Sequence, residues 1–158
     1  GRRYEGNYYM DKVQGFGTMY YVNGDTYTGL WDEGKRHGKG VYIWCYDGSN
    51  YNGEWLNDKK EGQGRMFWLD GASYEGEWKA DLRHGTGTFY YSNGDEYSGQ
   101  WRDNVQHGKG EYHVMTVIEL LITAAICAVV TAVLRFAPFL LFSSGKVGSR
   151  PYSSAQTS

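Results

Sequence analysis

The chain of 158 residues could form one domain, and its composition excludes several classes of protein. Glycine occurs 23 times and tyrosine 15 times but proline only twice, a mixture that suits short strands with tight turns and does not suit disorder. The formal net charge of −2 implies no general attraction to nucleic acid, so no nucleic-acid partner is expected. Cys45 and Cys127 lie in different kinds of segment, and therefore indicate no disulfide framework.

One unit recurs along most of the sequence. Each copy opens with Tyr-x-Gly, and a Gly-x-Gly pair begins eleven residues after the tyrosine. The intervals between copies are 23, 24, 23 and 23 residues, and the opening tyrosines are Tyr4, Tyr27, Tyr51, Tyr74 and Tyr97. A fixed period of this kind indicates an array rather than a single globular core.

The fourth copy shows how one unit is expected to fold. Residues 74–78 alternate large apolar with polar side chains, which predicts a strand. Residues 79–84 are polar and are predicted to form a loop, and residues 88–91 are β-prone and predict a second strand. Asn93-Gly94 predicts a tight hairpin turn, because this pair supplies residues with positive φ. Each unit is therefore a hairpin that buries its aromatic face only by stacking on its neighbours.

This pattern resembles the MORN repeat (membrane occupation and recognition nexus), which has YxGxW, a polar loop, GxG, an aromatic-rich strand and a turn glycine. Five copies cover about residues 1–114. The resemblance implies an all-β fold, an elongated open antiparallel sheet of successive β-hairpins. It also implies a scaffold, a dimerisation surface or a membrane-contact module, and the family includes accessory regions of lipid kinases and methyltransferases.

Two local departures from the repeat carry structural expectations. One extra residue lies between Val41 and Asp47, and we expect a β-bulge or a widened turn to absorb it. At the start, Gly1 and Tyr4 have the spacing of the junction between repeats. The chain is therefore expected to begin within an array, with at least one repeat upstream.

Aromatic side chains recur at two positions of the repeat and should form ladders along the sheet. Their expected role is the core of the array. An open sheet has two faces, however, so the alternative is an aromatic groove that holds a peptide or a helix. The candidate residues are Tyr27, Trp31, Tyr51, Trp55, Tyr74, Trp78, Tyr97 and Trp101.

The charged residues predict two different edges of the sheet. One edge is acidic, with Asp25, Asp47, Asp70, Asp95 and Glu96 in its turns. The loops of the other edge are mildly basic, and could contact anionic lipid headgroups at about 1 kcal/mol per well-placed cation. Because acids interleave with these bases, a mixed and solvated edge is the favoured alternative. The lipid-contact candidates are Lys35, Arg36, Lys39, Lys59, Lys60 and Arg83.

The sequence contains no motif for catalysis. It has no GxSxG, no phosphate loop, no HExxH and no paired-cysteine motif, so we expect neither enzymatic activity nor a cofactor. His37, His84 and His107 precede Gly-x-Gly in three copies. Equivalent sites in neighbouring hairpins lie roughly 10 Å apart, too far for two ligands of one zinc ion, so no metal site is expected.

The composition changes after Val114. Residues 115–142 are strongly apolar and are predicted to form a transmembrane helix, with a helix packed on the open sheet as the alternative. Residues 115–142, with Thr131, Arg135 and Pro138 at the spacing of a motif, resemble the first membrane helix of AzlD-type branched-chain amino acid transport proteins. Residues 143–158 are polar and are predicted to be disordered. A fusion of two reading frames would also produce so abrupt a change.

Three functional hypotheses remain open from the sequence. The first is a non-catalytic scaffold anchored to a membrane by the C-terminal helix, with cytoplasmic repeats that contact lipid, a protein partner or a second copy. The second is a soluble interaction module whose helix packs on its own sheet or on a partner. The third is the accessory region of a larger enzyme of the lipid kinase or methyltransferase type.

Overall fold

The computed structural model describes residues 1–142; residues 143–158, for which a disordered tail is predicted, lie outside the description. The side chains of Val129 and of residues 131–142 are also outside it. By its internal contacts the chain divides between Met115 and Thr116 into a strand-rich part and a part that contains one helix.

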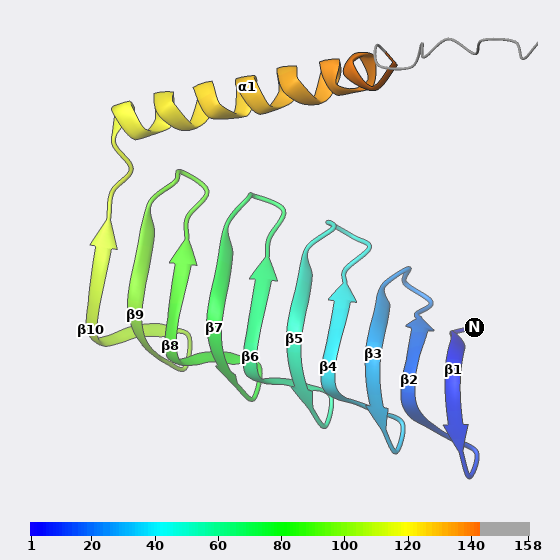
Figure 1. The fold of residues 1–158 in the computed structure, drawn as a ribbon. Helices are drawn as coiled ribbons and strands as arrows, with labels where there is room; N and C mark the ends of the chain where they lie inside the picture. The colour runs from blue at the N-terminus through cyan, green and yellow to red at the C-terminus, as the bar shows by residue number, and fades with distance from the viewer. Residues whose placement is uncertain (143–158) are drawn as a thin grey trace, which may run out of the picture. The chain divides into compact units, whose positions relative to one another are not determined.

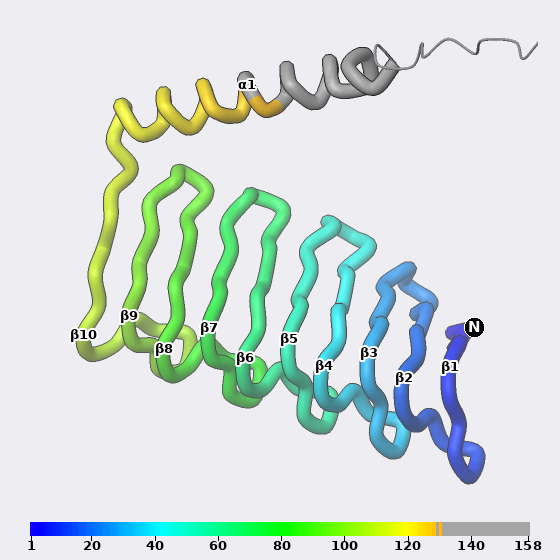
Figure 2. Tube along the Cα trace, viewed as in Figure 1, coloured from blue at the N-terminus to red at the C-terminus, as the bar shows by residue number. Residues whose placement is uncertain are grey.

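Ten strands form one open antiparallel sheet, in which each strand pairs with its neighbours in sequence (Figure 1). The Cα trace runs back and forth without a crossover (Figure 2). This confirms the predicted all-β array of successive hairpins. The strands are β1 (Arg3–Tyr9), β2 (Lys12–Tyr20), β3 (Thr26–Asp32), β4 (Lys35–Ile43), β5 (Asn50–Leu56), β6 (Lys59–Phe67), β7 (Ser73–Lys79), β8 (Leu82–Tyr90), β9 (Glu96–Arg102) and β10 (Val105–His113).

Glycines from all ten strands meet in one row across the sheet. Gly76 of β7 lies opposite Gly64 of β6 on one side and Gly87 of β8 on the other, and each further pair of strands repeats this register. We call this set the glycine row: Gly6, Gly17, Gly29, Gly40, Gly53, Gly64, Gly76, Gly87, Gly99 and Gly110. Because no side chain rises from it, the row leaves room for other side chains to lie directly on the backbone.

The predicted loop over residues 79–84 is wrong. β7 ends at Lys79 and β8 begins at Leu82, so the turn consists of Ala80 and Asp81. Both have positive φ, 48° and 73°, as a two-residue type I′ hairpin turn requires. The remaining residues belong to β8, where the pairing with β7 shifts register between Arg83 and Gly87. Gly85 lies at this shift and has a φ of 58°.

The turns between repeats lie at the other end of the strands and are wider. In the fourth copy the Tyr91 amide donates to the Asp95 carbonyl (2.8 Å), and only Gly94 of the Asn-Gly pair has positive φ. In the second copy the Trp44 amide reaches Ser49 instead (3.0 Å), one residue further on. The register of β4 with β5 is continuous, so the extra residue widens the turn and forms no bulge.

Aspartates in two of these turns bind the backbone of the following turn. The carboxylate of Asp25 is buried and accepts hydrogen bonds from the Tyr42 hydroxyl (2.7 Å) and the Cys45 amide (2.9 Å). Burial raises the pKa of Asp25, but these hydrogen bonds outweigh burial and the pKa is lowered. Asp95 accepts from the Met115 amide in the same way (2.8 Å), which fixes the end of the array.

The second part of the chain contains α1 (Val117–Phe142). Thr116 and Glu119 form a capping box at its start: the Thr116 amide donates to the Glu119 carboxylate (2.8 Å) and the Glu119 amide to the Thr116 hydroxyl (3.3 Å).

The prediction of a transmembrane helix is not supported. Within the described residues, no helix has the length and apolar character that crossing a membrane requires.

Candidate functional site: the aromatic face

The repeated tyrosines cover the glycine row. Tyr74 illustrates the arrangement: a Cβ added to Gly76 would lie 2.7 Å from its hydroxyl oxygen, and one added to Gly87 would meet its ring. The Tyr74 hydroxyl donates to the Glu77 carbonyl (3.1 Å), and the indole of Trp78 donates to the Gly64 carbonyl (3.0 Å). Both rings are thus held by hydrogen bonds to backbone carbonyl groups, which they can reach because the glycines of the row have no side chains in the way.

Tyrosines and tryptophans alternate edge to face from the second repeat to the fifth. The Tyr51 ring centroid lies 5.0 Å from that of Trp55 in its own repeat and 5.3 Å from that of Trp78 in the next. Tyr74 stands in the same way between Trp78 and Trp101. Such contacts contribute about 0.5–1.5 kcal/mol each beyond area burial. We call the eight residues Tyr27, Trp31, Tyr51, Trp55, Tyr74, Trp78, Tyr97 and Trp101 the aromatic ladder.

The aromatic ladder is the core of the array, as its expected role required. Its members are between 0% and 8% exposed. Partly buried neighbours pack against it, among them Tyr42, Trp44, Phe89 and Tyr91. An occupant of the predicted aromatic groove would therefore contact these neighbours and the edges of the ladder rather than whole ladder rings.

The ladder predicts that stability falls in alkaline solution. Burial raises the pKa of Tyr74 to about 12, and it raises the pKa of Tyr27 and Tyr51 as well. An unfolded tyrosine ionises near pH 10. The contribution of these tyrosines to stability should therefore be constant below about pH 10 and fall as the pH rises towards 12, because only the unfolded chain can then release these protons. Urea midpoints at about pH 8 and pH 11 test this, and Tyr74→Phe should reduce the fall; equal midpoints would contradict it.

Three cations lie over the ladder. Arg36, Lys60 and Arg83 occupy the same position in successive repeats, two residues before Gly-x-Gly. Their charged ends lie 4.4 Å, 4.2 Å and 4.5 Å from the ring centroids of Trp55, Trp78 and Trp101, respectively. These are cation–π distances. Burial lowers the pKa of Lys60.

Each of these three residues donates a hydrogen bond to the turn of the following repeat. Arg36 donates from Nε to the Asp58 carboxylate (3.1 Å) and from Nη2 to the Asp58 carbonyl (2.8 Å). Arg83 makes the same two contacts with Asn104 (3.4 Å and 3.0 Å). For Lys60 it is the backbone amide that donates, to the carboxylate of Asp81 (2.9 Å).

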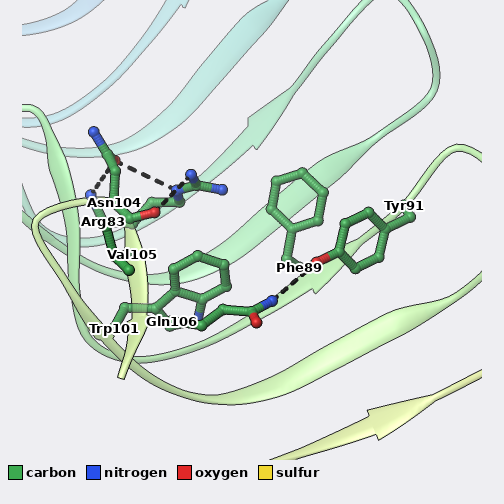
Figure 3. Close-up of a pocket in the computed structure, with 7 residues that line it drawn as sticks. All are labelled: Arg83, Phe89, Tyr91, Trp101, Asn104, Val105 and Gln106. Atoms are coloured by element: carbon green, nitrogen blue, oxygen red, sulfur yellow. Dashed lines mark hydrogen bonds between the residues drawn. The ribbon is translucent and has the colours of Figure 1, made fainter. Parts of the chain in front are cut away.

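Two hollows of related construction open on this face. One of about 320 Å³ is lined by Arg36, Tyr42, Trp44, Trp55, Asp58, Lys60 and Asp81. The other, of about 520 Å³, is lined by Arg83, Phe89, Tyr91, Trp101, Asn104, Val105 and Gln106 (Figure 3). The combination of rings, cations and hydrogen-bonding groups makes the aromatic face the candidate binding surface.

Comparison with known proteins identifies the repeats. The family model of the MORN repeat matches residues 4–26, 27–45, 51–73, 74–96 and 97–113, together more than half of the chain. The chain belongs to the MORN-repeat family. A comparison with curated proteins found no match. None of the matches supports the resemblance of the C-terminal helix to AzlD-type transport proteins.

One similar solved structure is the SAS-4 (dCPAP) TCP domain of Drosophila melanogaster, in complex with a proline-rich motif of Ana2 (dSTIL). The identity is 14%, the match covers 63% of this chain and 72% of that chain, and the TM-score is 0.39. At this TM-score the similarity carries no conclusion about the MORN array.

The six lipid-contact candidates of the MORN array do not form one patch. Arg36, Lys60 and Arg83 lie on the aromatic face, where their guanidinium and ammonium groups stack on rings. Lys35 and Lys59 are exposed, and the alternation of a strand directs them to the opposite face. Lys39 is exposed and lines a polar depression with Glu54, its partner across the sheet. Contact with anionic lipid stays a prediction.

The opposite face of the MORN sheet is polar. The Thr88 hydroxyl of β8 donates to the Ser98 hydroxyl of the adjacent β9 (3.0 Å), and Arg65 of β6 forms an ion pair with Glu75 of β7 (3.6 Å). Within residues 1–142, no group of three histidine, cysteine or acidic side chains could hold a metal ion. The sequence had not placed the three cations on the aromatic face, although their recurrence at one repeat position was a usable signal.

Proposed function

We propose that this MORN-repeat chain is a non-catalytic scaffold that binds a protein partner through its aromatic face. The observation that supports the proposal is the pair of hollows on that face, where aromatic rings and cations remain accessible beside a rigid core. Aromatic residues and arginine are the types enriched at the centres of protein interfaces. The polar face lacks this combination.

Site-specific photo-crosslinking in cells tests this proposal. A photo-reactive amino acid replaces Tyr91 on the aromatic face, and in a matched variant it replaces Thr88 on the polar face of the same repeat. We expect discrete protein crosslinks at Tyr91 and few at Thr88. Equal crosslinking at both positions, or none at Tyr91, would contradict binding through the aromatic face.

A second proposed function is membrane association, with the repeats on the cytoplasmic side. It is supported by the apolar side chains of α1, since Val117, Ile118 and Leu121 are 73%, 70% and 64% exposed. A contiguous exposed apolar surface of this kind is usually covered by lipid or by protein.

Fractionation of cells tests whether lipid or protein covers the apolar surface of α1. The intact chain is compared with a chain that ends at Val114, and the membranes are washed with carbonate or with salt. Retention of the intact chain alone would support membrane association through the C-terminal segment. Two soluble chains would contradict it, and salt-sensitive retention of the shorter chain would instead assign the contact to basic residues of the repeats.

A further inference from the structure

The hollow of the last repeat, which we call the Arg83 pocket, has an internal template in the same chain. Register and repeat position match six of its seven lining residues to residues of the hollow around Arg36, and Val105 has no counterpart there. The matched pairs are Arg83 with Arg36, Phe89 with Tyr42, Tyr91 with Trp44, Trp101 with Trp55, Asn104 with Asp58 and Gln106 with Lys60. The Arg36 hollow therefore shows one contact that an arginine at this repeat position makes, the ion pair of Arg36 with Asp58.

The two hollows differ in charge. The Arg36 hollow holds two cations and two carboxylates, those of Asp58 and Asp81, so its charges balance. In the Arg83 pocket, Asn104 replaces Asp58, Gln106 replaces Lys60, and no counterpart of Asp81 is among the lining residues. Arg83 is thus the one charged residue that lines the pocket, and it has no carboxylate there.

The Arg83 guanidinium is held in place and still has hydrogen-bonding capacity. It stacks on Trp101 at 4.5 Å and lies 5.1 Å from the centroid of Phe89. Asn104 accepts from its Nε and Nη2, as the dashed lines in Figure 3 show. Its other terminal nitrogen, Nη1, makes no hydrogen bond within residues 1–142. A group that is already ordered loses little freedom when a ligand binds.

We propose that the Arg83 pocket binds a carboxylate side chain of a partner polypeptide, together with an adjacent aromatic or aliphatic side chain. This rests on the protein-binding function proposed above and names the chemistry of the partner. Asp58 at Arg36 shows that an arginine at this repeat position pairs with a carboxylate (3.1 Å). The rings of Phe89 and Tyr91 supply the apolar wall, and about 520 Å³ is enough for side chains of this size.

Two blocked tetrapeptides test the proposal on the whole chain. Ac-Gly-Phe-Asp-Gly-NH2 carries the carboxylate and Ac-Gly-Phe-Asn-Gly-NH2 is its neutral match. Binding is followed by NMR at the Trp101 indole and the Gln106 side-chain amide. We expect the acidic peptide to bind about tenfold more tightly, as a charge-assisted hydrogen bond provides. Equal affinities would overturn the proposal, and so would equivalent shifts from inorganic phosphate at the same concentration.

Substitutions locate the effect at Arg83. Asn104→Asp adds the carboxylate that the Arg36 hollow already accommodates, so the variant should keep its fold. The ratio of its affinities for the acidic and the neutral peptide should fall to near one. Arg83→Gln should also remove the preference, and Lys39→Gln, in the polar depression beside Glu54, should leave it unchanged. An Asn104→Asp variant with the full preference would overturn the proposal. If crosslinks at Tyr91 persist while the peptides fail to discriminate, protein binding stands and the carboxylate chemistry is wrong.

Discussion

Gly76→Ala is expected to lower the free energy of unfolding of the array by about 3 kcal/mol, near the upper end of the usual cost of overpacking. An added Cβ would lie 2.6 Å from the Thr86 carbonyl oxygen and 2.7 Å from the Tyr74 hydroxyl. The first of these atoms is backbone of the paired strand, so it cannot move without disturbing the ladder of hydrogen bonds. The second belongs to a ring that is fully buried.

Urea unfolding of the variant measures the effect, and Gly71→Ala is the matched control. Gly71 has a φ of 88°, but a Cβ there would meet nothing within 4 Å. Its replacement should cost only the backbone strain of a left-handed residue, about 1–2 kcal/mol. If Gly76→Ala lowers the free energy of unfolding no more than Gly71→Ala does, the contact of tyrosine with the glycine row does not explain why glycine is needed there.

Tyr51→Ala is expected to cost about 4 kcal/mol, the range found for loss of a buried aromatic side chain. Tyr51 is fully buried, and its ring joins Trp55 of its own repeat to Trp78 of the next. Removing it takes away the contact through which neighbouring repeats stabilise each other. The unfolding transition should therefore broaden as well as shift to lower urea.

Tyr4→Ala provides the comparison in the first repeat. Tyr4 holds the same repeat position and contacts Tyr8 and Trp31, but it is only partly buried. We expect less than half the loss seen for Tyr51→Ala. Circular dichroism during urea unfolding gives both values. Equal losses would contradict a ladder whose central members couple the repeats.

Most of the fold could be predicted from the sequence because its determinants are local and recur. The period of Tyr-x-Gly and Gly-x-Gly predicted the number of repeated hairpins, and the resemblance to the MORN repeat implied that they form an open antiparallel sheet. The role of Tyr27, Tyr51 and Tyr74 as core followed from their recurrence at one position of the repeat. In each case one repeat supplied the pattern and the other copies supplied its confirmation.

The tight turns were missed for a physical reason. The type I′ turns contain Ala80-Asp81 and Asp103-Asn104, in which positive φ falls on residues other than glycine. The Asn-Gly pair that indicates such turns in sequence lies at the opposite end of the strands. Polar composition therefore predicted a loop in residues 79–84, where the chain is mostly strand.

The candidate site could be predicted only in part. Arg83 lies among polar residues, so composition assigned it to a solvated edge, whereas its guanidinium stacks on Trp101. A long cationic side chain can cover apolar rings while its charge still meets polar groups, which hydropathy does not reveal. The absence of a carboxylate at Asn104 became meaningful only after Asp58 was seen bonded to Arg36.

The register of the sheet has a mechanical consequence. Strands β1 to β10 lie side by side in sequence order, so their hydrogen bonds run along the length of the array. Tension along the array pulls adjacent strands directly apart. It therefore loads only a few of the hydrogen bonds between two strands at a time, and these bonds break one after another. Tension along a single strand would instead load a whole ladder in shear. The array should thus yield lengthwise at low force, one hairpin after another, and re-form when the tension is released.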